Sequence, residues 1–162
     1  MVSHFPVWVL PLLGLLVWLG VLQSRPRWVA PRRLAGVALG LGALSLWGVT
    51  VAFGPRPDAV LFWALGMTLA LALGPVLGPR GSMSFDAHAR RVHLPGSWLP
   101  LALMLGIFGI RFGLGVAAGL GDPVQGGSAT AAVCALALGL LSGGFAVRAR
   151  AVYRAARQAP AR

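Results

Sequence analysis

The chain has 162 residues, of which 57% are hydrophobic and only 10% are charged, and its mean hydropathy is +0.80. A soluble domain usually carries about 25% charged residues, so this composition excludes an ordinary water-soluble fold and favours a chain that uses lipid as its solvent. The apolar runs are long and continuous rather than alternating, which predicts membrane-spanning helices and not the strands of a barrel.

The charge is strongly one-sided. All fourteen basic residues are arginine, they face only three aspartates, and the formal net charge is +11. No groove-reading motif accompanies the arginines, so nucleic acid is not expected as a partner. Arginines beside apolar runs are typical of topology signals and of contacts with anionic lipid. The lack of Lys and Glu beside abundant Ala, Gly, Pro and Arg indicates a GC-rich coding sequence and predicts a bacterial origin.

Five apolar runs are long enough to cross hydrocarbon as helices, and together they predict one integral-membrane domain. The first run precedes its arginines instead of following them, so we expect a retained helix and not a cleaved signal peptide. The segment 148–162 is predicted to be a basic tail that continues the last helix for a few turns. The predicted spans are 5–22, 34–53, 59–77, 98–120 and 128–147.

The distribution of arginines predicts the orientation of this all-α bundle. With five spans, twelve of the fourteen arginines fall on one side and only Arg56 falls on the other. The positive-inside rule then puts the N-terminus outside and the C-terminus in the cytoplasm of a bacterial inner membrane. The arginines nearest the predicted span ends, expected to fix topology and to contact anionic lipid, are Arg25, Arg27, Arg32, Arg33, Arg148, Arg150, Arg154 and Arg157.

Small residues recur at four-residue spacing within the predicted spans. Residues four apart share a helix face, and a small-residue face lets two helices approach closely. We expect packing within the chain, with a homo-oligomer as the alternative use of such a face. Trp18, Trp47 and Trp63 lie deep within spans and are expected to pack between helices. The small-residue series are Gly36 and Gly40, Gly109 and Gly113, Gly115 and Gly119, and Ala131, Ala135, Gly139 and Gly143.

Arg111 is the one charged residue inside a predicted span. It lies roughly 20 Å beyond the start of the fourth span, given 1.5 Å per helical residue. Charged side chains at that depth usually face the bundle interior or a wet cavity and mark function, which predicts a site for an anion or a polar headgroup. The alternative is an arginine that extends to the outer surface and pairs there with Asp58 or Asp122.

The connection between the third and fourth spans contains the histidines that lie closest to an acid. Asp86, His88 and His93 form a weak metal-ligand pattern, since no cysteine or glutamate joins them. The alternation of apolar and polar residues on either side of 86–89 predicts a short cytoplasmic β-hairpin instead. No resident metal or cofactor is therefore expected.

Catalytic patterns are missing from the sequence. There is no Ser-His-Asp grouping, no H-E-x-x-H, no glycine-rich phosphate loop and no pair of carboxylates within a span. Cys134 is a lone thiol in an apolar run and is expected to pack rather than react. The sequence thus predicts a protein that is not an enzyme.

One segment resembles a known family. The run Pro95-Gly96-Ser97-Trp98-Leu99-Pro100-Leu101, with a basic residue at 111 and the earlier Arg25-Pro26-Arg27, is similar to an uncharacterised family of small bacterial integral-membrane proteins with four or five spans. The resemblance implies the same topology and draws attention to Trp98 and Arg111, and it implies no activity.

Three functions therefore remain open, the weakest being a membrane enzyme that uses the loop with Asp86, His88 and His93. The first is binding or transport of a small anionic or amphipathic molecule at Arg111, with Trp98 as a second ligand-binding candidate. The second is a structural or accessory membrane subunit whose basic cytoplasmic face docks a partner or anionic lipid.

Overall fold

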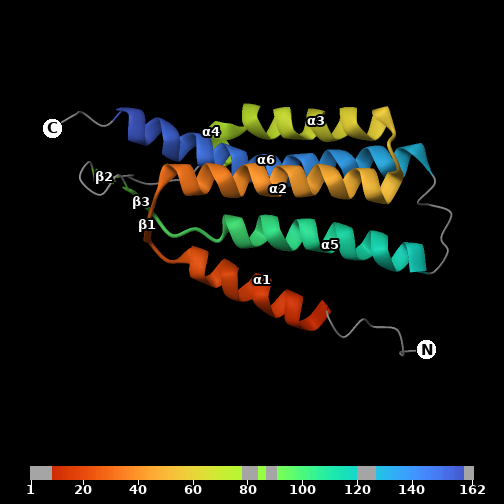
Figure 1. Ribbon diagram of the computed structural model, residues 1–162, viewed down its shortest axis with the longest axis horizontal. Helices are drawn as coiled ribbons and strands as arrows, with labels where there is room; N and C mark the ends of the chain where they lie inside the picture. The colour runs from red at the N-terminus through yellow and green to blue at the C-terminus, as the bar shows by residue number, and fades with distance from the viewer. Residues whose placement is uncertain (1–8, 78–83, 87–90, 120–126, 159–162) are drawn as a thin grey trace.

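Long helices lie side by side with a small sheet at one end of the molecule in the computed structural model, which describes residues 9–77, 84–86, 91–119 and 127–158 (Figure 1). Helices α2, α3 and α6 form one group, and α5 and α1 extend it on one side (Figure 1). The elements are α1 (Val9–Ser24), β1 (Arg27–Val29), α2 (Pro31–Phe53), α3 (Pro57–Ala72), α4 (Gly74–Leu77), β2 (Ser84–Asp86), β3 (Arg91–Leu94), α5 (Leu99–Gly119) and α6 (Ser128–Gln158).

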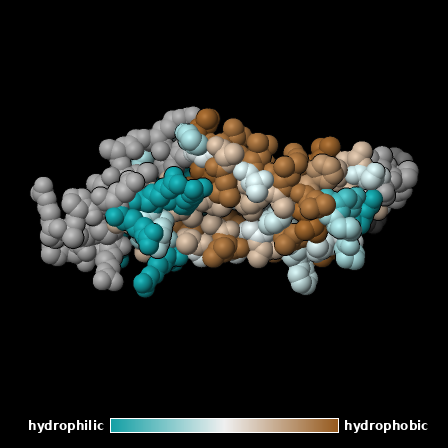
Figure 2. Space-filling model, turned by 90° about the horizontal axis from the view of Figure 1, so that it is seen from above, coloured by the Kyte–Doolittle hydropathy of each residue, from teal (hydrophilic) through white to brown (hydrophobic). Residues whose placement is uncertain are grey.

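Three helices, α2, α5 and α6, are long and apolar enough to cross a membrane, while α1 and α3 are apolar but shorter. Hydrophobic residues cover the middle of the molecule, and hydrophilic residues gather towards its ends (Figure 2). Helix α6 continues to Gln158, so the predicted helical continuation into the basic tail is confirmed.

The third predicted span, residues 59–77, is not one helix. Helix α3 ends at Ala72, and the four residues from Gly74 to Leu77 form the separate turn α4. Pro75 explains the break, because its ring clashes with the carbonyl four residues earlier and it has no N–H to donate. Elsewhere proline starts helices: Pro31 and Pro57 occupy the first turns of α2 and α3, where a missing N–H costs little.

The closest helix contact joins α3 and α6 through glycine. A Cβ at Gly139 would overlap the backbone of Trp63, and one at Gly66 would overlap the backbone of Leu136. Ala131 and Ala135 on the same face of α6 are fully buried. The prediction that this stripe packs within the chain is confirmed, and Gly66 is a partner that the sequence reading missed. In contrast, a Cβ would meet nothing within 4 Å at Gly36, Gly40, Gly109, Gly113, Gly115 or Gly119.

A polar relay joins the three central helices. The indole Nε1 of Trp63 donates to Ser45 Oγ at 3.1 Å, and that hydroxyl donates to the carbonyl of Leu138 at 3.4 Å. Trp63 therefore packs between helices as predicted. The same prediction is wrong for Trp18 and Trp47, whose side chains are 60% and 69% exposed. The closest contacts between α3 and α6 are made by glycine and alanine instead.

The sheet lies against the C-terminal part of α6. Strand β3 is central and pairs antiparallel with both β2 and β1. Asp86 of β2 lies opposite Arg91 of β3, and the loop of the predicted hairpin, 87–90, lies outside the described residues. Strand β1 was not predicted, because it lies between the predicted spans 5–22 and 34–53, where no helix or strand was expected. Val92 and Leu94 of β3 are buried together with Val152 of α6, which anchors the sheet to that helix.

Candidate functional site

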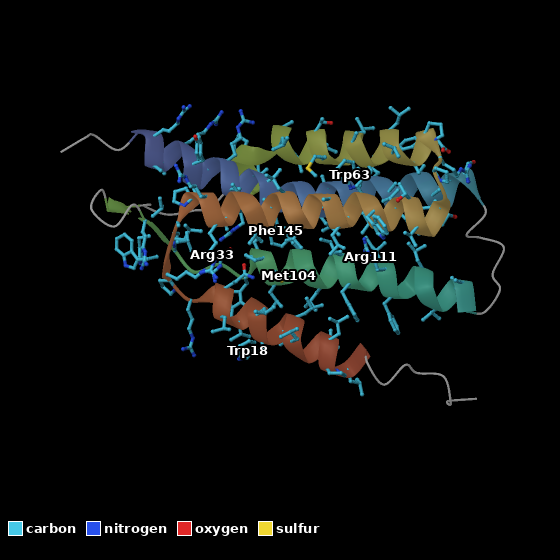
Figure 3. The ribbon with its side chains drawn as sticks, in the orientation of Figure 1. Trp18, Arg33, Trp63, Met104, Arg111 and Phe145 are labelled. Carbon is cyan, nitrogen blue, oxygen red and sulfur yellow. The ribbon has the colours of Figure 1, made fainter. Side chains whose placement is uncertain are left out.

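Arg111 of α5 extends between α5 and α2 (Figure 3). Its Nη2 donates a hydrogen bond to the backbone carbonyl of Leu44, 2.6 Å away. Gly48, one turn further along α2, makes room for the guanidinium, since a Cβ there would overlap Nη2 and Cζ. The sequence analysis did not predict this contact, because Gly48 belongs to none of the small-residue series at four-residue spacing.

The guanidinium lies along the middle of both helices and not at their ends. Arg111 is about 18 Å past the start of α5, and Leu44 is about 20 Å past the start of α2, at 1.5 Å per residue. Asp58, one of its two predicted ion-pair partners, instead lies 3.4 Å from the guanidinium of Arg56. Asp122, the other, lies outside the described residues. Among the described residues, Arg111 is thus hydrogen-bonded to a backbone carbonyl and not to Asp58.

This geometry gives an expected result for the solvent accessibility of Arg111. We expect a cysteine at position 111, in a Cys134→Ala background, to resist a membrane-impermeant thiol reagent applied from either side of a vesicle. The physical reason is that position 111 lies midway along α5, opposite the middle of α2, far from either end of the bundle. Trp98→Cys is the matched control, because Trp98 is 63% exposed at the start of the same helix and should label from one side. Labelling at 111 that small anions block would instead support a ligand site there.

Trp98 and Arg111 do not form one site. Trp98 immediately precedes α5 and Arg111 lies within it, so the two residues are roughly 20 Å apart along the helix axis. The side chain of Trp98 is also exposed. Each of these ligand-binding candidates therefore stands alone in the structure.

The weak metal pattern is only partly described. The ring of His93 packs against Trp28 of β1, with centroids 5.1 Å apart, and Asp86 lies opposite Arg91 in the strand register. His88 lies outside the described residues. Among the residues that the structure describes, no three His, Cys, Asp or Glu side chains come together as a metal site would require.

A groove forms where α6 runs past the break between α3 and α4. Its volume is about 350 Å³, which lies within the usual range of ligand sites. Leu71, Pro75 and Val147 supply apolar walls, and Arg150 and Arg154 supply the charge. Both arginines are exposed and share one face of α6, since they are four residues apart. The sequence located these arginines, but the groove depends on the α3–α4 break that it did not predict.

The eight arginines expected to fix topology and to contact lipid gather at one end of the molecule. They belong to the α1–α2 connection, to the start of α2 and to the end of α6, which lie beside the sheet (Figure 1). Arg148 differs from the rest because it is buried, with only 5% of its surface exposed. The exposed members are Arg25, Arg27, Arg32, Arg33, Arg150, Arg154 and Arg157.

An apolar helical bundle with three helices of membrane-spanning length and an arginine-rich end is the architecture of a helical membrane protein. The chain belongs to the family of unknown function DUF6622, whose model matches residues 1–162. Comparison with curated proteins and with solved structures found no match.

Proposed function

We propose that this protein is a non-enzymatic component of the bacterial inner membrane that binds anionic phospholipid through its arginine-rich cytoplasmic end. It acts as an accessory or structural subunit rather than a transporter. The observation that carries the proposal is the groove beside α6, which combines apolar walls with two exposed arginines.

The arrangement of the helices supports five spans with the N-terminus outside. Successive long helices alternate in direction, so that β1, the β2–β3 pair and the end of α6 all lie at one end of the bundle (Figure 1). The two shorter apolar helices, α1 and α3, have 16 residues each and reach about 24 Å, somewhat less than a typical hydrocarbon core. Bilayers accommodate such a mismatch by local thinning at modest cost.

The groove fits the chemistry of an anionic lipid. Arginine donates a planar fork of N–H groups that matches phosphate oxygens, and each exposed arginine near an anionic surface contributes about 1 kcal/mol. Leu71, Pro75 and Val147 provide the apolar contact that the glycerol and the first acyl carbons need. A headgroup at Arg150 and Arg154 would therefore have its chains directed towards the apolar middle of the bundle.

Binding at the groove is favoured over binding at Arg111 for a geometric reason. The Nη2 of Arg111 is already engaged by Leu44, whereas the groove arginines are exposed and lie beside open space. The hydrogen bond of Arg111 serves to hold α5 against α2, which fits a structural role for that residue.

The test is the lipid selectivity of the double variant Arg150→Gln/Arg154→Gln. In vesicles of phosphatidylcholine with about one fifth phosphatidylglycerol, spin-labelled phosphatidylglycerol should associate with the wild-type protein in preference to labelled phosphatidylcholine. The double variant should lose about thirtyfold in that preference, since two contacts of about 1 kcal/mol each are removed.

Arg56→Gln is the control variant, because Arg56 lies at the opposite end of the bundle, between α2 and α3. It should keep the selectivity of the wild type. If the double variant keeps that selectivity as well, the groove is not the lipid site and the proposed function loses its support.

A further inference from the structure

Arg148 is a buried cation whose charge is not neutralised by the described part of the chain. Its side chain is only 5% exposed, and its Nη1 is buried without a hydrogen-bond partner among the described residues. Buried polar atoms are nearly always hydrogen-bonded, and buried charges are paired, so such an atom needs an explanation.

The surroundings of Arg148 on α6 are apolar. Phe145 and Ala149 belong to a buried cluster with Leu103 of α5. Val152, one turn further on, belongs to the cluster that anchors the sheet. Arg148 is thus buried on the part of α6 that contributes to two hydrophobic clusters, where an unpaired charge is unfavourable.

Arg148 interacts electrostatically with another cation. The exposed Arg27 of β1 repels it, and β1 pairs with β3, which packs on α6 through Leu94 and Val152. Asp58 is paired with Arg56 on the far end of α3. Asp86 belongs to β2, and the central strand β3 separates β2 from β1, which contains Arg27. Arg27 and Arg148 therefore place two positive charges where the sheet packs on α6, and neither forms an ion pair with a described residue.

We propose that a phosphate group binds between Arg148 and Arg27 and completes this junction. A phosphate has enough acceptor oxygens to receive hydrogen bonds from two guanidinium groups at once, and bonds of this type are among the strongest in proteins. The exposed Arg27 receives the anion on the solvent side, and the unpartnered Nη1 of Arg148 binds it from the protein side.

This phosphate site is distinct from the groove. Arg150 is two residues from Arg148, so the two side chains leave α6 on nearly opposite faces, one towards α3 and α4 and the other towards the sheet. Binding here joins β1 to α6 through an ion and therefore stabilises the fold, whereas the groove takes a lipid from outside. The phosphate can belong to a lipid headgroup or to a soluble phosphate compound.

The experiment is a thermal-stability titration of the full chain in an uncharged detergent at constant ionic strength. Inorganic phosphate and a short-chain phosphatidylglycerol are titrated separately, with chloride as the matched salt. We expect the wild-type Tm to rise and saturate with at least one of them. A response to inorganic phosphate identifies a soluble phosphate as sufficient, and a response to phosphatidylglycerol alone identifies a lipid headgroup.

Two variants test the residues. Arg148→Lys keeps the charge but removes the planar fork, and Arg27→Gln removes the second cation, so each should weaken the apparent affinity for phosphate at least tenfold. Arg148→Met should fold without phosphate and show no response to it, because the buried charge is gone. The groove variant Arg150→Gln/Arg154→Gln is the control and should keep the full response.

Three results would overturn the proposal. The first is a Tm that follows ionic strength alone, with no effect specific to phosphate. The second is a phosphate response that persists in Arg148→Lys and in Arg27→Gln. The third is a response lost only in the groove variant, which would assign the phosphate to the groove and leave the proposed lipid-binding function intact.

Discussion

Gly139→Ala is expected to destabilise the protein by about 2 kcal/mol, whereas Gly109→Ala is expected to stabilise it by up to about 1 kcal/mol. Both substitutions add one methyl group in a helix and gain the same intrinsic helix propensity. The new Cβ at Gly139 overlaps the backbone of Trp63, which cannot move aside as a flexible side chain would. At Gly109 nothing lies within 4 Å.

The comparison is made by chemical unfolding in mixed micelles, followed by circular dichroism at fixed detergent composition. The opposite signs are what the α3–α6 contact requires, since an effect of detergent or of helix propensity would move both variants in the same direction. Equal stability of the two alanine variants would mean that α3 and α6 do not approach as closely as the glycine contacts indicate.

The second large effect is expected at the junction between the sheet and α6. Val152→Lys should cost about 3 kcal/mol and release the sheet from the helix, because it introduces a buried cation into an apolar cluster. Val152 is fully buried against Val92 and Leu94, and the positive charges of Arg148 and Arg27 in this region add repulsion. Tyr153→Lys adds the same charge one residue along, where the side chain is half exposed, and should cost little.

Hydrogen exchange of the backbone amides of β1 and β3 measures this release directly. In Val152→Lys the exchange of these amides should accelerate at least tenfold while the amides of α3 stay protected. Unchanged protection of β3 would show that its pairing with its neighbours, and not its packing on α6, keeps the sheet in place.

The helical class and the bounds of most elements could be predicted because each depends on local chemistry. Continuous apolar runs predicted α2, α5 and α6, and the small-residue stripe on α6 predicted a close contact within the chain. Two local signals were misread. Pro75 was included in a span that it breaks, and the short β1 after Pro26 lies where no helix or strand was expected.

The candidate sites were harder to predict, because they depend on which segments meet. Arg111 was singled out correctly as a charge within an apolar helix, but its partner is a backbone carbonyl, which leaves no residue-type signal in the sequence. Nothing in the sequence distinguishes Arg148 from the other arginines of the basic tail, but in the structure it is buried and is repelled by Arg27 of β1. Asp58 and Asp122 were named as ion-pair candidates and Asp86 as part of a weak metal pattern. Sequence alone does not show which side chain lies beside an isolated aspartate.

The pairing of β1 with β3 has a consequence for the order of biogenesis. Arg27 pairs with Leu94, so the first strand leaves the ribosome long before its partner exists, and at roughly 5–20 residues per second it waits for several seconds. Helix α6, which supplies the main partner of α3 and the support of the sheet, is synthesised later still. The packing of the sheet and the α3–α6 contact can therefore form only after α6 has been synthesised.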